Sequence, residues 1–190
     1  MTLVGAHELA STSDLDVARA ILQRYDARTP EQQTTRARML AFVDAHPADA
    51  HLRSCVPGHL TASALVVDAR RERALLTFHK KLRRWLQLGG HCDGDANLAA
   101  AALREAREES GIDGLVIDPA PIDLDIHVIP ARKDEPEHLH LDTRFVVVAP
   151  DGATLRISEE SLELAWFTRG ELAAIETDDS VRRLFALALG

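Results

Sequence analysis

The chain has 190 residues, of which 46% are hydrophobic and 27% charged, and this average composition excludes a disordered, collagen-like or low-complexity protein. Its 30 acidic and 22 basic residues give a formal net charge of −8, so nucleic acid and anionic membranes are poor bulk partners. The sequence has no apolar run near the ~20 residues that cross a bilayer, no signal-peptide pattern at its start and only two cysteines, and it therefore predicts a cytoplasmic protein.

Residues 1–55 predict a helical N-terminal extension. Apolar residues recur three and four positions apart between Asp14 and Tyr25, which is typical of an amphipathic helix. A second helix begins around Pro30, because proline is well tolerated in the first helical turn, and it ends before His46. We expect these two helices to form a hairpin that docks on the domain formed by residues 56–190.

Residues 56–190 mix short strands with helices. Strands are predicted over Leu60–Val67, Arg73–Phe78, Trp85–Leu88, Leu115–Ile117, Ile122–Ile129, His138–Ala149 and Leu164–Phe167. Helices are predicted over Asn97–Ser110, Arg169–Ile175 and Asp179–Leu189. This irregular order favours an α/β fold, with a mixed sheet that is covered by helices on both faces.

The helix predicted over Asn97–Ser110 carries an unusual group of carboxylates. Glu105, Glu108 and Glu109 are three and four positions apart, so they share one face within a single turn. Like charges at these spacings repel one another, and the negative end of the helix dipole repels them further. Converging carboxylates are the oxygen ligands that hard divalent cations prefer, so the pattern has two alternatives, a cation site and a solvated helix face, and the spacing of the surrounding segment decides between them.

The spacing of the segment around this helix resembles the Nudix box, G-x5-E-x7-R-E-U-x-E-E-x-G-U, in which U is an apolar residue. The match runs from Gly90 to Ile112 and includes Arg104-Glu105, Glu108-Glu109 and Gly111. One fixed position departs from the pattern, because Ala96 stands where the box has its first glutamate. The resemblance implies a Nudix-type α/β/α sandwich with a mixed sheet, to which the helical N-terminal extension is added.

Nudix hydrolases cleave a diphosphate linked to a variable group, so the resemblance implies a pyrophosphohydrolase that acts on a small phosphorylated substrate with Mg²⁺ or Mn²⁺. By resemblance, the metal ligands are Glu105, Glu108, Glu109 and the carbonyl of Gly89, and Glu105 is also a candidate base. Arg104 is expected to position the carboxylates, and Glu160 is a candidate catalytic acidic residue from a later loop. Family members often dimerise, so the resemblance also implies that a homodimer is possible.

Two further groups of residues are candidates for substrate binding. A basic loop precedes the glycine turn, and its members Lys80, Lys81, Arg83 and Arg84 are candidates to contact substrate phosphates or, alternatively, to solubilise a hairpin. His138 and His140 are two apart on a predicted strand and therefore share a face, and His91 follows the glycine turn. These three histidines are candidate phosphate or metal ligands.

Two alternatives stay open. The segment that begins at His59 and the pair Gly90-His91 are similar to isopentenyl diphosphate isomerase, an enzyme of the same fold that is not a hydrolase, although Gly89 stands where the isomerase has a cysteine. The substitution at Ala96 also allows a non-catalytic Nudix module that only binds a ligand.

Overall fold

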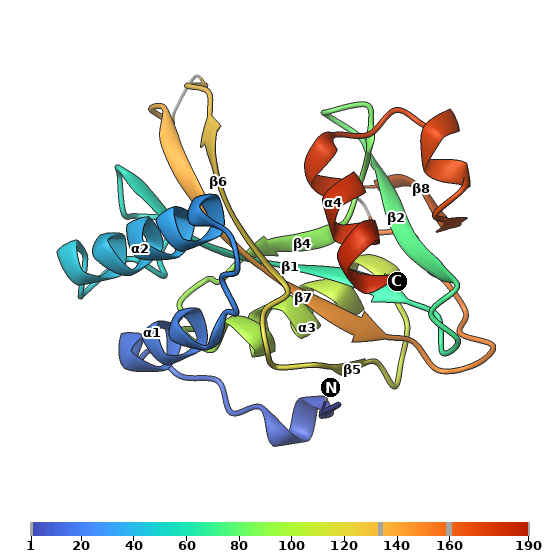
Figure 1. Cartoon of the computed structure of the whole chain (residues 1–190), viewed down its shortest axis with the longest axis horizontal. Coiled ribbons are helices and arrows are strands. Elements are labelled where there is room, and N and C mark those ends of the chain that lie inside the picture. The colour runs from blue at the N-terminus through green and yellow to red at the C-terminus, as the bar shows by residue number, and fades with distance from the viewer. Residues whose placement is uncertain (1, 133–134, 159–160, 190) are drawn as a thin grey trace.

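The computed structural model describes residues 2–132, 135–158 and 161–189, which form one mixed sheet with helices around it (Figure 1). The strands are β1 (Gly58–Val67), β2 (Arg73–His79), β3 (Trp85–Leu86), β4 (Leu88–His91), β5 (Val116–Ile117), β6 (Asp123–Ile129), β7 (His138–Val148) and β8 (Ser161–Thr168). The α-helices are α1 (Leu15–Arg24), α2 (Pro30–Ala45), α3 (Leu98–Ser110) and α4 (Asp179–Ala188). Two 3₁₀ helices, η1 (Ala6–Glu8) and η2 (Glu171–Ala174), complete the described elements.

The sheet is organised around β1, which pairs in parallel with β7 from Gly58 opposite Leu139 to Val67 opposite Val148. The other strand pairs are antiparallel: β2 and β4 pair with β1, β5 and β6 pair with β7, and β3 and β8 pair with β2. β1 is buried along its whole length, and its first half alternates the polar residues His59, Thr61 and Ser63 with small or apolar ones, whereas its second half is apolar throughout.

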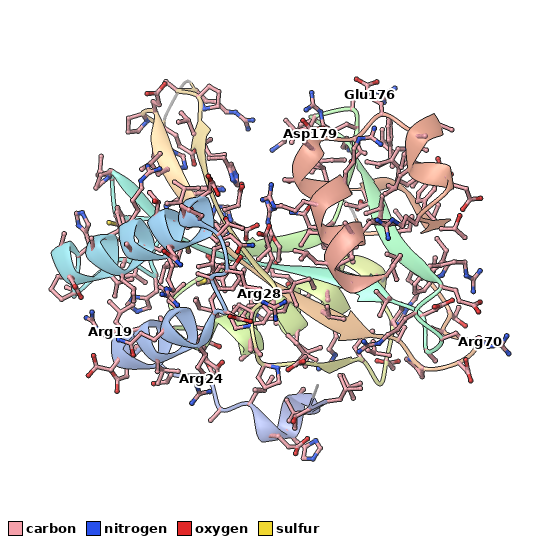
Figure 2. The ribbon with its side chains drawn as sticks, viewed as in Figure 1. Arg19, Arg24, Arg28, Arg70, Glu176 and Asp179 are labelled. Carbon is pink, nitrogen blue, oxygen red and sulfur yellow. The ribbon has the colours of Figure 1, made fainter. Side chains whose placement is uncertain are left out.

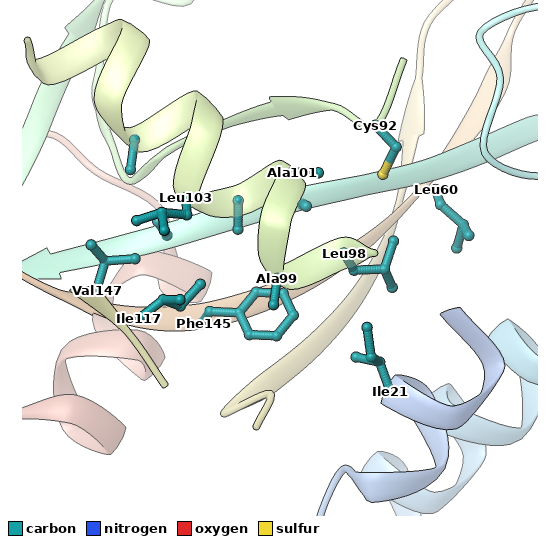
Figure 3. Close-up of a cluster of buried hydrophobic side chains, with 14 of the residues drawn as sticks. Ile21, Leu60, Cys92, Leu98, Ala99, Ala101, Leu103, Ile117, Phe145 and Val147 are labelled. Atoms are coloured by element: carbon teal, nitrogen blue, oxygen red, sulfur yellow. The ribbon is translucent and has the colours of Figure 1, made fainter. Parts of the chain in front are cut away.

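Alternate residues of the central strands face two separate cores. On one face of the sheet, Leu60 and Phe145 pack with Ala99 and Leu103 of α3 (Figure 3). On the other face, Leu65 and Val146 pack with Phe185 of α4. The sheet is therefore covered by helices on both sides, which confirms the predicted α/β sandwich.

The two helices of the N-terminal extension have capped N-termini and pack on the core of the domain. Asp14 caps α1, and Thr29 forms a capping box with Gln32 at the start of α2. Buried residues of both helices, among them Ile21 and Met39, join the core on the α3 side. The charged side chains of Arg19 and Arg24 on α1 lie at the edge of the molecule (Figure 2).

Most predicted elements are confirmed, and the differences have local causes. The segment predicted as a helix over Arg169–Ile175 is a four-residue 3₁₀ helix, η2, so this prediction was wrong in type. Its carboxylate Glu171 accepts hydrogen bonds from the backbone and the hydroxyl of Thr168, which fixes a tight turn. The strand predicted over Trp85–Leu88 is interrupted and pairs with two different neighbours, as β3 with β2 and as β4 with β1. Among the described residues, no helix has the length and apolar character needed to cross a membrane.

Candidate active site

Helix α3 begins after the capping residue Asn97 and ends at Gly111. The Asn97 side chain accepts a hydrogen bond from the backbone N–H of Ala100, and Gly111 ends the helix in the left-handed region at φ 64°. Small and apolar residues, among them Ala99, Leu103 and Ala106, are buried against β1 and β7. The neighbouring face of the helix therefore points its glutamates toward the strand β4.

Two of these glutamates contact the glycine turn directly. An oxygen of Glu109 accepts a hydrogen bond of 3.0 Å from the backbone N–H of Gly89. The carboxylate of Glu105 lies against Gly90, where a Cβ atom would come within 2.4 Å of its Oε2. Gly90 therefore leaves the space that the Glu105 carboxylate occupies. The Glu108 side chain is on the same helix face and is 61% exposed.

Arg104 links the helix carboxylates to the end of β4. One guanidinium nitrogen donates to Oε1 of Glu105 at 2.6 Å and lies 3.5 Å from Oε2 of Glu108. The other donates to the backbone carbonyl of His91 at 2.8 Å. Such charge-assisted hydrogen bonds fix both distance and orientation. These are the contacts that Arg104 would use in the positioning role that the resemblance implies.

Burial raises the pKa of Glu105, whose side chain is 14% exposed, and the neighbouring Arg104 charge only partly offsets this effect. A buried hydrogen-bonded group around Asp142 joins β1 and β7. Asp142 accepts hydrogen bonds from Thr61 and Ser63 on β1 and from Arg144 on its own strand. The sequence analysis missed this buried group because no local motif links β1 with β7.

One cleft of about 860 Å³ joins most of the predicted site residues. Its lining includes Gly89, Gly90, His91, Arg104, Glu105, Glu108, Glu109, His138 and His140. Of the four basic loop residues, Lys81 lies in the lining, whereas Lys80, Arg83 and Arg84 are exposed and outside it. Arg83 instead lies over the ring of Phe78, and its backbone has a positive φ of 56°. Glu160 lies outside the described residues.

A cluster of five histidines forms another part of the same cleft. The register of the parallel strands places His59 directly opposite His140, and their ring centroids are 4.8 Å apart. His91 of β4 lies 5.0 Å from His59 and 5.1 Å from His140, and His138 and His127 flank the group. Burial lowers the pKa of His91 to about 4, and burial together with the neighbouring histidines lowers that of His140 to about 2. Both rings are therefore neutral at pH 7.

His59 and His127 were not predicted as site residues. Each is a single histidine in an apolar or mixed strand, a pattern that usually indicates a structural residue. The useful signal was the spacing of His138 and His140 by two positions on one strand, but it points to His59 and His127 only when the pairing of that strand with β1 and β6 is known.

The thiol of Cys92 is not accessible in the way that a catalytic thiol is. Cys92 is 1% exposed and packs in the core on the α3 side, and burial raises the pKa of its thiol. A side chain at position 89 would also be unfavourable, because a Cβ on Gly89 would lie 2.6 Å from Cα of Ser63.

The fold and the sequence pattern are shared with known proteins. A family model described as NUDIX domain matches residues 57–188. Among curated proteins, none matches the chain at a significant level.

Three solved structures illustrate the likeness in fold. An Ap4A hydrolase from C. elegans, in a binary complex, is 17% identical with a TM-score of 0.54, and the match covers 67% of this chain and 92% of that one. A NUDIX family hydrolase from Clostridium perfringens is 24% identical with a TM-score of 0.51, covering 69% and 93%. The E. coli dihydroneopterin triphosphate pyrophosphohydrolase is 15% identical with a TM-score of 0.50, covering 66% and 91%.

At these identities the solved structures support the fold, and the family model supplies the assignment because it spans more than half of the chain. The matched region contains the complete segment from Gly90 to Ile112 and the strands that form the cleft. The chain therefore belongs to the Nudix hydrolase family.

Proposed function

We propose that the protein hydrolyses a diphosphate linkage in a small phosphorylated substrate, with Mg²⁺ or Mn²⁺ as its cofactor. The observation that carries this proposal is the meeting of helix α3 with the glycine turn. There, Glu105 and Glu109 contact Gly90 and Gly89, and Arg104 joins Glu105 to the end of β4.

The donor set fits a hard divalent cation. Glu105, Glu108 and Glu109 supply carboxylate oxygens, and Gly89 adds a backbone carbonyl, which are the ligand types that Mg²⁺ and Mn²⁺ prefer. Because Gly90 has no side chain, the Glu105 carboxylate fits against β4 without displacing the strand. When bound, such an ion would neutralise charge on the diphosphate and make the attacking water more acidic.

Three residues of the chain would accept the proton, bind the substrate phosphate and position the carboxylates. Glu105 would accept a proton from the attacking water, because its side chain is only 14% exposed and Arg104 fixes its orientation. Lys81, at the rim of the cleft, would bind a substrate phosphate. Arg104 would fix the carboxylates of Glu105 and Glu108 in place through its guanidinium, and it would therefore act as a positioning residue.

The solved structures guide the choice of substrates. Their names describe hydrolases of Ap4A and of dihydroneopterin triphosphate, so the first panel would contain dinucleoside polyphosphates, nucleoside triphosphates, nucleotide sugars and prenyl diphosphates. Each compound would be incubated with the protein and Mg²⁺ or Mn²⁺, and the phosphorylated products identified. Absence of turnover over the whole panel would favour a non-catalytic binding module.

The decisive variant is Glu109→Gln, which removes one carboxylate charge and preserves the shape of the side chain. We expect kcat for the best substrate to fall at least about 100-fold, because a cation site supplies several kcal/mol of charge stabilisation in the transition state. Glu72→Gln, at an exposed position of the β1–β2 turn, is the matched control and should retain full activity. Near-normal turnover by a folded Glu109→Gln protein would contradict the proposed site.

The same panel separates hydrolysis from isomerisation. Conversion of isopentenyl diphosphate to dimethylallyl diphosphate without release of phosphate would favour the isomerase alternative. Buried Cys92 and the close contact behind Gly89 make the hydrolase the better supported of the two.

A further inference from the structure

Three histidines from three different strands bring their ring nitrogens together beside the carboxylates. A ring nitrogen of His59 on β1, one of His91 on β4 and one of His140 on β7 all lie within 4.8 Å of one another. The strand pairing fixes this arrangement, because β1 lies between β4 and β7, with Thr61 opposite His91 and His59 opposite His140. The cluster is therefore supported by the rigid centre of the sheet.

Three ring nitrogens of this cluster are buried without a hydrogen-bond partner among the described residues. Both ring nitrogens of the 4% exposed His59, and Nε2 of His140, are buried without a hydrogen bond of normal geometry to any described residue. Buried polar atoms usually have a partner, because leaving one unpaired costs free energy. The two flanking histidines differ in this respect: Nδ1 of His127 is 3.1 Å from Asp125, and Nδ1 of His138 is 2.9 Å from the carbonyl of Pro136.

From this geometry we infer that His59, His91 and His140 bind a divalent transition-metal ion of the Zn²⁺ class. Neutral imidazole nitrogens suit Zn²⁺ and its neighbours, whereas Mg²⁺ prefers oxygen. Three protein ligands that face a cleft leave a fourth position for water or for a substrate oxygen, as in catalytic zinc sites. Three neutral ligands also leave the full charge of the ion in place, in a chain whose net charge is −8.

This site is separate from the carboxylate site, although the two share a cleft. Its ligands lie on the strands, whereas Glu105, Glu108 and Glu109 lie on α3. The Arg104 guanidinium connects the two groups, since it donates both to Glu105 and to the backbone carbonyl of His91. The inference goes beyond the proposed hydrolase activity and does not depend on it.

The test is metal binding by the whole chain after removal of bound metal with a chelator. Co²⁺ would be titrated as a spectroscopic probe, and Zn²⁺ by calorimetry with metal analysis of the dialysed protein. With excess Mg²⁺ present to occupy the carboxylate site, we expect one further ion per chain and the strong visible absorption of four-coordinate Co²⁺. His91→Gln and His140→Gln should each weaken binding at least about tenfold.

Control variants identify which group of residues holds the ion. Glu109→Gln removes a carboxylate of the other site, and Cys55→Ser disables a second group, His46, Asp49 and Cys55, whose ligand atoms are also within 4.8 Å of one another. Neither change should alter the visible spectrum or the affinity, and the exposed His7→Gln should also have no effect. Circular dichroism and thermal unfolding of the metal-free variants establish that each is folded.

Three outcomes would overturn the inference. One is the absence of four-coordinate Co²⁺ absorption in the wild-type protein. Another is equal affinity in wild type and in folded His91→Gln and His140→Gln variants. The third is loss of the signal in Cys55→Ser, or a thiolate charge-transfer band in the wild-type spectrum, which would place the ion at the other group.

Discussion

At the scale of single residues, the site depends on the absence of a side chain at Gly89 and Gly90. Gly90 has no side chain at the point where the Glu105 carboxylate lies, and Gly89 donates its backbone N–H to Glu109. The two glycines serve different purposes. A Cβ at position 89 would collide with the backbone of Ser63, whereas a Cβ at position 90 would meet only the end of a flexible side chain.

Gly90→Ala tests this difference. The added Cβ would lie 2.4 Å from Oε2 of Glu105, so we expect the carboxylate to move while the strand stays in place. A displacement of about 1 Å at a reacting group can cost on the order of 100-fold in rate, and we expect kcat to fall by that order. Thermal unfolding should change little.

Gly170→Ala is the matched control, because its nearest neighbour is the Thr168 hydroxyl at 4.0 Å and its φ is −68°. Normal kinetics for Gly90→Ala would show that the Glu105 carboxylate is free to move without affecting the reaction, and would remove its proposed role.

At the scale of secondary-structure elements, β6 and β7 are joined by a buried network of ion pairs. Arg144 on β7 donates to Asp142 beside it, and to Asp123 and Asp125 on β6. Arg183 of α4 binds Asp123 and Asp125 from the outside. The side chains of Arg144, Asp123 and Asp142 are only 2–3% exposed, so each charge depends on its partners for stabilisation.

We predict that Arg144→Met lowers the free energy of unfolding by about 3–5 kcal/mol, because it leaves buried carboxylates without their shared cation. Urea unfolding at pH 7 measures the change. Arg183→Met should cost less, since the Arg183 side chain is 42% exposed and remains partly solvated. Equal effects of the two substitutions would contradict the assignment of Arg144 as the central cation.

The same network predicts a loss of stability in acid. Burial raises the pKa of Asp125, but the hydrogen bond to His127 and the charges of Arg144 and Arg183 outweigh burial and hold this pKa well below its usual range. A carboxyl with a lowered pKa in the folded state stabilises the protein above its unfolded pKa of about 3.9, and this contribution disappears as the pH falls through the folded pKa. Urea unfolding of wild type between pH 6 and pH 2 should show a decline that begins below about pH 5 and steepens under the unfolded pKa, and Asp125→Asn should flatten it.

At the scale of the whole molecule, the N-terminal extension and the Nudix box are parts of one structure. The backbone carbonyl of Thr12 accepts a hydrogen bond from the N–H of Ala96, and the N–H of Thr12 donates to the carboxylate of Asp95. The side chain of Asn97 donates to the backbone carbonyl of Ala10. Ala96 is completely buried beneath this segment. The departure from the box therefore coincides with the place where the extension crosses it.

Restoring the glutamate of the box at this position should harm the protein. Ala96→Glu would place a carboxylate in a buried apolar position, so we expect the free energy of unfolding to fall by several kcal/mol, without a gain in turnover. Ala41→Glu, on an exposed position of α2, is the control and should be nearly neutral. An Ala96→Glu protein that is as stable as wild type and more active would show that the extension does not exclude the glutamate.

The sequence by itself determined the features that depend on local spacing. Glu105, Glu108 and Glu109 share a face because helical periodicity places residues three and four apart together, and the glycine end of α3 follows from the tolerance of Gly111 for positive φ. Most strands and helices were also predicted from the sequence, while the helix predicted over Arg169–Ile175 is the 3₁₀ helix η2, because four residues are too few to show a helical type by their period.

Only the tertiary structure decided which distant residues meet. His59 and His140 lie far apart in the chain, and the parallel register of β1 with β7 brings them together, a pairing that no local pattern encodes. The same applies to Arg144 and its carboxylates, and to Lys81, which lines the cleft whereas Lys80, Arg83 and Arg84 do not. Local spacing fixes the face of a helix, whereas strand pairing and loop conformation depend on contacts between segments distant in the sequence.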